Sequence, residues 1–271
     1  MSVITLLSDF GYQDNYVAVI KGVILSRCRD SPPILVDITH SISPQDIFRT
    51  SLLVKDTQEY FPPNTIHFVL VDSGVDVGRR AVILQSKSNQ FFVGPDNGVF
   101  SHLIQSEQVK AAFVCDQKEL FLEQVGENFA GRDVFAPIAS RLAQGISIES
   151  LGSPIAIHSL ITIEIPSPGL EYDSQGKLVQ ITGEIVYIDS FGNLFSNVSS
   201  SLLKQVDSKS VVVTLEDLIL YGIKNAFSEV RVGETLCYFG SSDSIEFAIR
   251  NGNAAQTLGT TKGQGVSISM P

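Results

Sequence analysis

The sequence contains few basic residues, only three cysteines and no long apolar run. Its 19 Lys and Arg residues are outnumbered by 29 Asp and Glu residues, which gives a formal net charge of −10 at pH 7. This balance argues against a nucleic-acid partner, because binding to phosphates requires concentrated Lys and Arg side chains. It is compatible with a small cationic ligand, but the same balance is common among proteins that are simply soluble.

The three cysteines, Cys28, Cys115 and Cys237, are far apart in the sequence and form no CxxC pair. This spacing gives neither a disulfide framework nor a zinc-binding pattern, so we expect three buried thiols in a reducing compartment. No basic segment precedes the short apolar run at the N-terminus, and no stretch approaches the roughly 20 apolar residues of a membrane helix. We therefore expect a cytoplasmic protein with no membrane partner.

Several common catalytic and binding motifs are also missing. The sequence contains neither GxGxxG nor GxxxxGK[ST], the glycine motifs that bind phosphates, and neither a GxSxG elbow nor an HExxH zinc motif. The four histidines, His40, His67, His102 and His158, are scattered along the chain. Because an isolated histidine is more often a structural residue than a ligand, the sequence gives little support for a metal site.

The first half of the chain alternates between strand and helix patterns, as recognised from the spacing of its apolar residues. We expect strands at 3–7, 33–38, 65–71 and 109–115, helices at 15–28, 43–60 and 132–145, a turn into a helix at 95–104, and a hairpin formed by 81–86 and 89–94. Ser43, Pro44 and Asp46 are expected to begin the second helix, and Asp133 is expected to cap the helix at 132–145. Continuous apolar strands separated by helices predict a buried parallel sheet.

The composition changes after residue 145. Residues 151–175 are rich in Pro, Ser and Gly and predict a linker after an α/β domain at 1–150. From residue 176 to 271 short strand patterns separated by turn residues predict a second domain, a small antiparallel β-barrel or sandwich. The strands of this domain are expected at 178–189, 193–198, 210–215, 235–240, 244–249 and 265–270.

Acidic residues follow the expected strands of the first domain. The segments SDFG (8–11), DITH (37–40), VDSG (71–74) and GPDNG (94–98) each place an acid directly after an apolar run. One such acid is usually a helix cap or a turn former. Four of them at one edge of a sheet favour a binding site, because ligands bind beyond the carboxyl ends of strands in open parallel sheets.

Six segments of the chain, taken in order, carry a resemblance to one family. They are LLSDFGYQDNYVAVIKG (6–22), DITHSISPQDI (37–47), FPPNTIHFVLVDSGV (61–75), GPDNG (94–98), NFAGRDVFAPIASRLAQG (128–145) and YIDSFGNLFSN (187–197). Together they resemble the S-adenosyl-L-methionine (SAM) hydroxide adenosyltransferases, or adenosine-forming SAM hydrolases, which are related to the fluorinase and the chlorinase. The resemblance covers nearly the whole chain and implies the same order of an α/β domain and a small β-barrel.

The resemblance implies that water or hydroxide attacks C5′ of the ribose, so that SAM is hydrolysed to adenosine and L-methionine without a further cofactor. Asp72 and Arg79 would hold and activate the water, as two members of the family's Asp–Arg–His group. The other implied contacts are Asp9 with the ribose hydroxyls, Phe129 and Gly131 along the ribose and nucleophile pocket, Asp189 with the methionine ammonium, Phe191 and Asn193 with adenine, and Ser241 with the methionine carboxylate. The family also implies a homotrimer, with each site between the first domain of one subunit and the second domain of its neighbour.

Plainer interpretations exist for several of these residues. Asp9 could cap the helix at 15–28, and Asp189 could form an Asx turn. Asp72 and Arg79 could form an exposed ion pair, which contributes little to stability. For each residue considered alone, the plainer structural interpretation is favoured. The resemblance favours a role in the site instead for Asp9, Asp72 and Asn193.

The sequence departs from the family pattern at three positions. The loop that usually reads VDPGVG has Ser73 in place of the proline and Asp76 in place of the glycine. The larger change lies in FAGRD (129–133), where Ala130 replaces the histidine of the family pattern FHGRD. Alanine can neither position water nor accept a proton. Whether His40 or His102 approaches the position beside Ala130 is a question for the structure.

Two interpretations follow from Ala130. In the first, the chain is a slower SAM hydrolase that holds water with Asp72 and Arg79. In the second, it is a module that binds adenosine or SAM, with lost or weak catalysis. A SAM halogenase is less favoured, because Gly131 follows the hydrolase pattern and the sequence builds no obvious halide cage.

Overall fold

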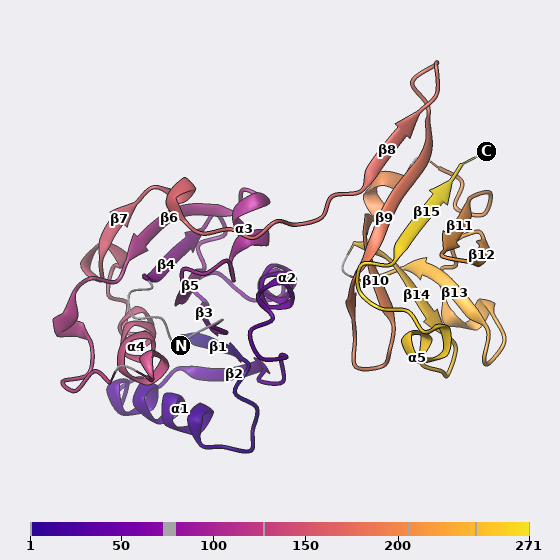
Figure 1. Cartoon of the computed structure of the whole chain (residues 1–271). Coiled ribbons are helices and arrows are strands. Elements are labelled where there is room, and N and C mark those ends of the chain that lie inside the picture. Colours follow the sequence, from indigo (N-terminus) through magenta and orange to yellow (C-terminus); the bar gives the residue numbers. More distant parts are fainter. Residues whose placement is uncertain (1, 73–79, 127, 205, 242, 271) are drawn as a thin grey trace. The chain divides into compact units, whose positions relative to one another are not determined.

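The computed structural model describes residues 2–72, 80–126, 128–204, 206–241 and 243–270. The chain forms two compact units, Met1–Ile165 and Pro166–Pro271 (Figure 1). The first contains a mixed sheet covered by helices, and the second is an antiparallel barrel-like sheet. The expected combination of an α/β domain and a small antiparallel β domain is therefore confirmed.

The first unit is built on a seven-stranded sheet with the order β2-β1-β3-β5-β4-β6-β7. Strands β1 (Val3–Ser8), β2 (Ile34–Thr39), β3 (Ile66–Leu70) and β5 (Phe91–Pro95) run parallel to one another. The other strands, β4 (Ala81–Ser86), β6 (Val109–Val114) and β7 (Ser153–Ile155), extend the sheet by antiparallel pairing. The expected parallel sheet and the expected hairpin are both present, and β7 adds a strand from within 151–175.

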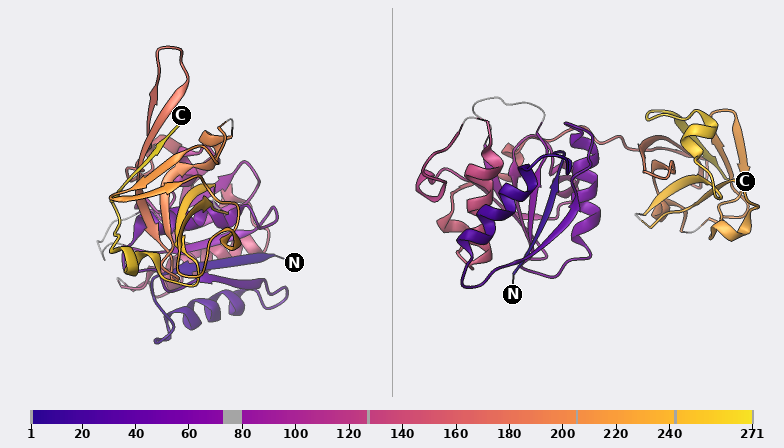
Figure 2. Two further views of the ribbon diagram at one scale, coloured as in Figure 1. Left: turned by 90° about the vertical axis from the view of Figure 1, so that its right-hand side faces the viewer. Right: turned by 90° about the horizontal axis from the view of Figure 1, so that it is seen from below.

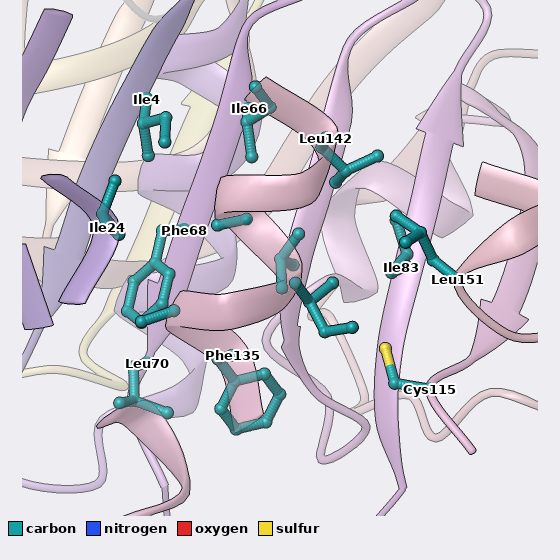
Figure 3. Packing of buried hydrophobic residues seen from close by; sticks show 14 of the residues in the cluster. Ile4, Ile24, Ile66, Phe68, Leu70, Ile83, Cys115, Phe135, Leu142 and Leu151 are labelled. Atoms are coloured by element: carbon teal, nitrogen blue, oxygen red, sulfur yellow. The ribbon is translucent and has the colours of Figure 1, made fainter. Parts of the chain in front are cut away.

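Helices cover both faces of this sheet (Figure 2). Helices α1 (Tyr16–Arg27) and α4 (Ala136–Ala143) pack on one face, where Ile24 and Leu142 join an apolar cluster with Ile4, Phe68 and Ile83 (Figure 3). Helices α2 (Ile47–Gln58) and α3 (Ser101–Gln105) contribute Val54 and Leu103 to a second cluster, with Leu7, Val69 and Phe92 of the sheet. The alternation of side chains along each strand supplies both clusters, because successive residues point to opposite faces.

Two helix starts differ from the sequence-based expectation. Helix α2 begins at Ile47, because Asp46 is its N-cap and accepts a hydrogen bond from the Arg49 N–H at 3.0 Å. The preceding Gln45 has φ 66°, which is incompatible with a helix beginning at Pro44. Asp133 caps no helix. It lies within a π-helical turn, Gly131–Phe135, where its buried carboxylate accepts a hydrogen bond from the Gly126 N–H at 2.8 Å.

The second unit is an eight-stranded antiparallel sheet with the order β12-β11-β15-β9-β10-β14-β13, and β8 pairs with β9 outside this path. The strands are β8 (Gly169–Tyr172), β9 (Leu178–Ile188), β10 (Leu194–Ser199), β11 (Val212–Leu215), β12 (Leu218–Tyr221), β13 (Thr235–Phe239), β14 (Ser244–Ile249) and β15 (Gly265–Ser269). A bridge between Lys224 and Tyr238 brings the chain after β12 beside β13, so the sheet is nearly closed. Its interior is filled by apolar residues such as Ile181, Leu194 and Phe247.

Candidate functional site

Four candidate segments of the first unit share one edge of the sheet. Asp9, His40, Asp72 and Asp96 follow β1, β2, β3 and β5 within two residues of each strand end. Because these four strands are parallel, their carboxyl ends lie at the same edge. Three of the four expected acids, Asp9, Asp72 and Asp96, therefore lie at this edge, whereas the acid of DITH, Asp37, lies within β2.

Asp9 is partly buried, and its Oδ2 accepts a hydrogen bond from the backbone N–H of Gln45 at 3.0 Å. It does not cap helix α1, whose N-cap is Asn15 and has no side-chain capping bond. The helix-cap interpretation of Asp9 is therefore wrong. Within the described part of the chain, its hydrogen bonds engage one carboxylate oxygen, and the other oxygen remains suited to a ligand hydroxyl.

Asp72 is joined to the loop that follows β5. The side-chain nitrogen Nδ2 of Asn97 lies 3.4 Å from Asp72 Oδ1 and 3.0 Å from the carbonyl oxygen of Val71. This contact fixes the start of the loop after β3. The remaining residues of that loop, including Ser73, Asp76 and Arg79, lie outside the described residues.

The neighbouring arginine, Arg80, has a structural partner. Its Nε donates to Asp96 Oδ2 at 2.8 Å, and its Nη2 donates to the carbonyl oxygen of Ser159. Asp96 is almost fully buried, and its Oδ1 accepts the N–H of Ile161 at 2.8 Å. Arg80 therefore fastens the segment 159–161 to the end of β5, and this engagement makes it a poor substitute for Arg79.

Three aromatic side chains gather beside the end of β1. The Phe129 ring meets Phe10 and Tyr16 edge-on, with centroids 5.9 and 5.4 Å apart. Gly131 is buried behind them, and a Cβ at this position would lie 2.3 Å from Leu70 Cδ2. A side chain at residue 131 would therefore require the end of the Leu70 side chain in β3 to shift.

Neither of the two histidines considered for the position beside Ala130 is available. Ala130 is exposed, whereas His40 is buried, with its Nδ1 2.6 Å from Ser8 Oγ. His102 pairs through Nδ1 with Ser51 Oγ at 3.0 Å, between α2 and α3. Burial and the nearby Lys55 lower the pKa of His102 to about 4, so this side chain is neutral at pH 7.

In the second unit, Asp189, Phe191 and Asn193 lie together on the β9–β10 turn. Asp189 Oδ1 accepts the N–H groups of Phe191 and Asn193 at 2.9 and 2.8 Å, and its Oδ2 accepts Asn193 Nδ2 at 2.9 Å. The expected Asx turn is therefore formed. Phe191 is 76% exposed on this turn.

Ser241 is exposed on the β13–β14 turn. The strand that follows this turn carries Glu246, a buried acid that was not predicted from the sequence. Glu246 of β14 accepts a hydrogen bond from the Tyr238 hydroxyl at 2.5 Å and one from the Ser244 hydroxyl at 3.1 Å. Burial, the hydrogen bond to Glu246 and the charges of Glu246 and Asp189 raise the pKa of Tyr238. A glutamate within the apolar run SIEFAI was the available signal for this group.

Other features lie away from these residues. A cavity of about 340 Å³ opens at the opposite edge of the first sheet, beside Ser2, Asn64 and Phe91. All three cysteines are buried and unbridged. Across the described ranges no three or more His, Cys, Asp or Glu side chains are grouped to hold a metal. None of the helices in those ranges combines the length and apolar character needed to cross a membrane.

Comparison with known proteins places both units in one family. Residues 4–152 match the SAM hydroxide adenosyltransferase N-terminal domain, and residues 183–267 match the C-terminal domain of the same name. The chain is 30% identical to the (R)-S-adenosyl-L-methionine hydrolase of Salinispora tropica, over 98% of this chain and 97% of that protein. It is also 30% identical to the protein of the same name from Thermus thermophilus, over 99% and 100% of the two chains.

A solved structure shows the same similarity. The crystal structure of an uncharacterized conserved protein from Thermotoga maritima matches with a TM-score of 0.88 and 31% identity, over 98% of this chain and 99% of that one. The family expected from the six sequence segments is thus confirmed by matches over both units. This chain belongs to the SAM hydroxide adenosyltransferase family.

Proposed function

We propose that this protein hydrolyses SAM to adenosine and L-methionine, with water or hydroxide attacking C5′ of the ribose. The observation that carries the proposal is the position of Asp9 and Asp72 at the carboxyl ends of two adjacent parallel strands, β1 and β3. This is the edge at which ligands bind in open α/β sheets. Two carboxylates there suit a substrate that combines a ribose diol with a sulfonium cation.

The proposed reaction requires the protein to position the reactants and to accept a proton from the attacking water. Methionine leaves SAM as a neutral thioether, so the leaving group needs no general acid. The site must hold water, C5′ and sulfur in line, and Asp72 can accept a proton from the attacking water. Asp9 binds the ribose hydroxyls through its carboxylate. Arg79 completes the proposed water site from the neighbouring loop.

The remaining contacts of the proposed site come from the second unit. Asp189 binds the methionine ammonium, Phe191 and Asn193 contact adenine, and Ser241 holds the methionine carboxylate. Phe129 and Gly131 border the ribose from the first unit. Because the proposed residues fall into two groups, one in each compact unit, we further propose a homotrimer in which the first unit of one subunit and the second unit of its neighbour form each site.

Binding of adenosine or SAM with little turnover is the second candidate function. The observation that favours it is Ala130, since both His40 and His102 have other partners. A general base typically contributes about 10²–10⁴-fold to a rate, so its loss slows a reaction without abolishing it. Asp72 remains as a proton acceptor, and for this reason we favour a slow hydrolase.

One assay separates the two functions. Purified protein is incubated with SAM, adenosine is followed by chromatography, and binding of SAM is measured by calorimetry. Hydrolysis predicts adenosine that accumulates in proportion to protein, and that falls to the protein-free rate in the variants Asp9→Asn and Asp72→Asn. Binding without any adenosine above the protein-free rate during long incubation would instead establish the binding module.

A further inference from the structure

His40 is hydrogen-bonded to the chain on both sides of Asp9 in the sequence, at Ser8 and at Gly11. On one side, Ser8 Oγ and His40 Nδ1 lie 2.6 Å apart. On the other side, the Gly11 N–H donates to the carbonyl oxygen of His40 at 2.7 Å. Both Ser8 and His40 are only 2% exposed. The segment that carries Asp9 is therefore held at two points by one residue of the neighbouring strand's loop.

His40 is itself held in place. Its Nε2 lies 3.2 Å from Asp37 Oδ1, in a close contact that is not aligned as a hydrogen bond. The other oxygen of Asp37 accepts hydrogen bonds from Lys21 Nζ at 2.6 Å and from the Tyr12 hydroxyl at 3.3 Å. The Tyr12 ring also meets the imidazole edge-on, with centroids 5.1 Å apart. These contacts fix the direction of the imidazole ring.

The order serine, histidine, aspartate is that of a nucleophilic triad, but this group cannot attack a substrate. Ser8 Oγ is buried and also lies 3.4 Å from the N–H of Phe10. A nucleophile must instead face the reacting carbon. What the group does contact is the backbone on either side of Asp9, whose carboxylate is held by Gln45 in the same β2–α2 connection.

We propose that Ser8 and His40 are positioning residues for Asp9, which fix the β1–α1 segment so that its carboxylate meets the ribose diol. This inference rests on the proposed role of Asp9 in nucleoside binding. A displacement of about 1 Å can cost roughly 10²-fold in activity, even when the altered residue lies away from the chemistry. Loss of the Ser8 hydroxyl is therefore expected to weaken nucleoside binding specifically. A variant with a similar loss of stability elsewhere in the sheet should not weaken it.

The same strand supplies a matched control. Thr5 Oγ1 lies 2.9 Å from His67 Nδ1, and both residues are buried. Ser8→Ala and Thr5→Val each remove one buried hydroxyl that pairs with an imidazole nitrogen. The two variants should lose similar amounts of stability, but only Ser8 is adjacent to Asp9.

The test measures adenosine binding by calorimetry and unfolding by urea for wild type, Ser8→Ala, Ser8→Thr and Thr5→Val. We expect Ser8→Ala to raise the Kd for adenosine about tenfold or more, Ser8→Thr to restore it, and Thr5→Val to leave it within about twofold. If Ser8→Ala does not fold, Asp37→Ala replaces it, because this change frees the outer side of His40 at a partly exposed position. Where SAM turns over, KM should rise more than kcat falls.

The outcomes also separate this inference from the proposed function. One outcome is that wild type binds adenosine and Asp9→Asn weakens this binding, whereas Ser8→Ala or its replacement does not. In that case the positioning role is wrong, but the nucleoside site is supported. Equal weakening by Thr5→Val would reduce the effect to general destabilisation and overturn the role as well. If wild type binds neither adenosine nor SAM, the proposed function and the positioning role both fall.

Discussion

The side-chain amide of Asn97 donates a hydrogen bond to the carboxylate of Asp72, with Nδ2 and Oδ1 3.4 Å apart. The same nitrogen lies 3.0 Å from the carbonyl oxygen of Val71, at the end of the strand that precedes Asp72. Asn97 thus ties the exit of β3 to the loop after β5. In the proposed reaction it holds the carboxylate that accepts the proton of water.

Replacing Asn97 by Ala should therefore lower kcat for SAM hydrolysis by about tenfold, since a mispositioned acceptor loses part of its contribution. The variant should also lose roughly 1–3 kcal/mol of stability, because it removes the hydrogen bonds to Asp72 and to the Val71 carbonyl, which each contribute about 0.5–1.5 kcal/mol. Initial rates of adenosine formation and urea unfolding measure the two effects. Gln85→Ala is the control, because it removes a side-chain amide that bonds Asn89 at the other end of the sheet. Equal rates in the two variants would contradict the role of Asn97.

Ala130→His should raise the turnover of SAM. The change restores the base of the family pattern at an exposed position that precedes the π-helical turn. A general base can contribute about 10²–10⁴-fold, so an increase within that range is the expected result. Adenosine formation at saturating SAM measures it, and Ala130→Gln controls for the added bulk. A His variant that folds and binds SAM but turns over no faster would show that the missing histidine does not limit the rate.

Acid should destabilise the first unit through His67. Burial lowers the pKa of His67 to about 4, although the neighbouring Gln90 partly opposes this shift. The folded state therefore keeps this ring neutral, while the unfolded chain binds a proton below its ordinary pKa of about 6.5. The contribution of the neutral His67 ring to stability is complete above about pH 6.5, and it is lost as the pH falls from about 6.5 towards 4. At pH 5, protonation of this one histidine in the unfolded chain lowers the free energy of unfolding by about 2 kcal/mol. The reason is that pH 5 lies about 1.5 units below 6.5, and each unit corresponds to about 1.36 kcal/mol.

Urea unfolding at pH 7.5 and pH 5.0 tests this expectation. His102, whose pKa is also lowered to about 4, adds a parallel loss, so the wild-type difference should exceed that of a single histidine. His67→Gln removes one of the two groups and should reduce the difference by about 2 kcal/mol. An unchanged difference in the variant would mean that His67 does not carry the acid sensitivity.

The apolar runs of the sequence predicted the main strands because burial on both faces leaves an unbroken pattern, as in β1 and β3. Strands β8 and β12 and helix α5 of the second unit were not predicted, and β8 lies within the segment 151–175 that was expected to be a linker. Strand β12 follows β11 through a two-residue turn at Glu216 and Asp217, where Glu216 has φ 51°. Glutamate is an uncommon residue for this left-handed conformation, so residues 216 and 217 do not indicate a hairpin turn. Helix α5 (Ala254–Leu258) has only five residues, too few for an apolar period.

The candidate site also contains residues that the sequence indicated and residues that it did not. Asp9 and Asp72 follow apolar runs, which is a local pattern that favoured a binding site at this edge, but their individual roles were predicted from the resemblance to the family. The pair formed by Ser8 and His40 was not predicted, because its members are separated by 32 residues and meet only through the parallel pairing of β1 with β2. A histidine considered alone offers no indication of its partner.

The proposed homotrimer makes a prediction that no single variant can test. Asp72→Asn damages the first unit of a site, and Asp189→Ala damages the second, so each variant alone should be almost inactive. If each site combines units from two subunits, equal co-expression of the two variants gives some sites in which both units are intact. For random assembly around a three-fold axis this fraction is about one quarter, so about a quarter of wild-type activity should return. Sites formed within one chain would each contain one damaged unit, and the mixture would then be as inactive as its components.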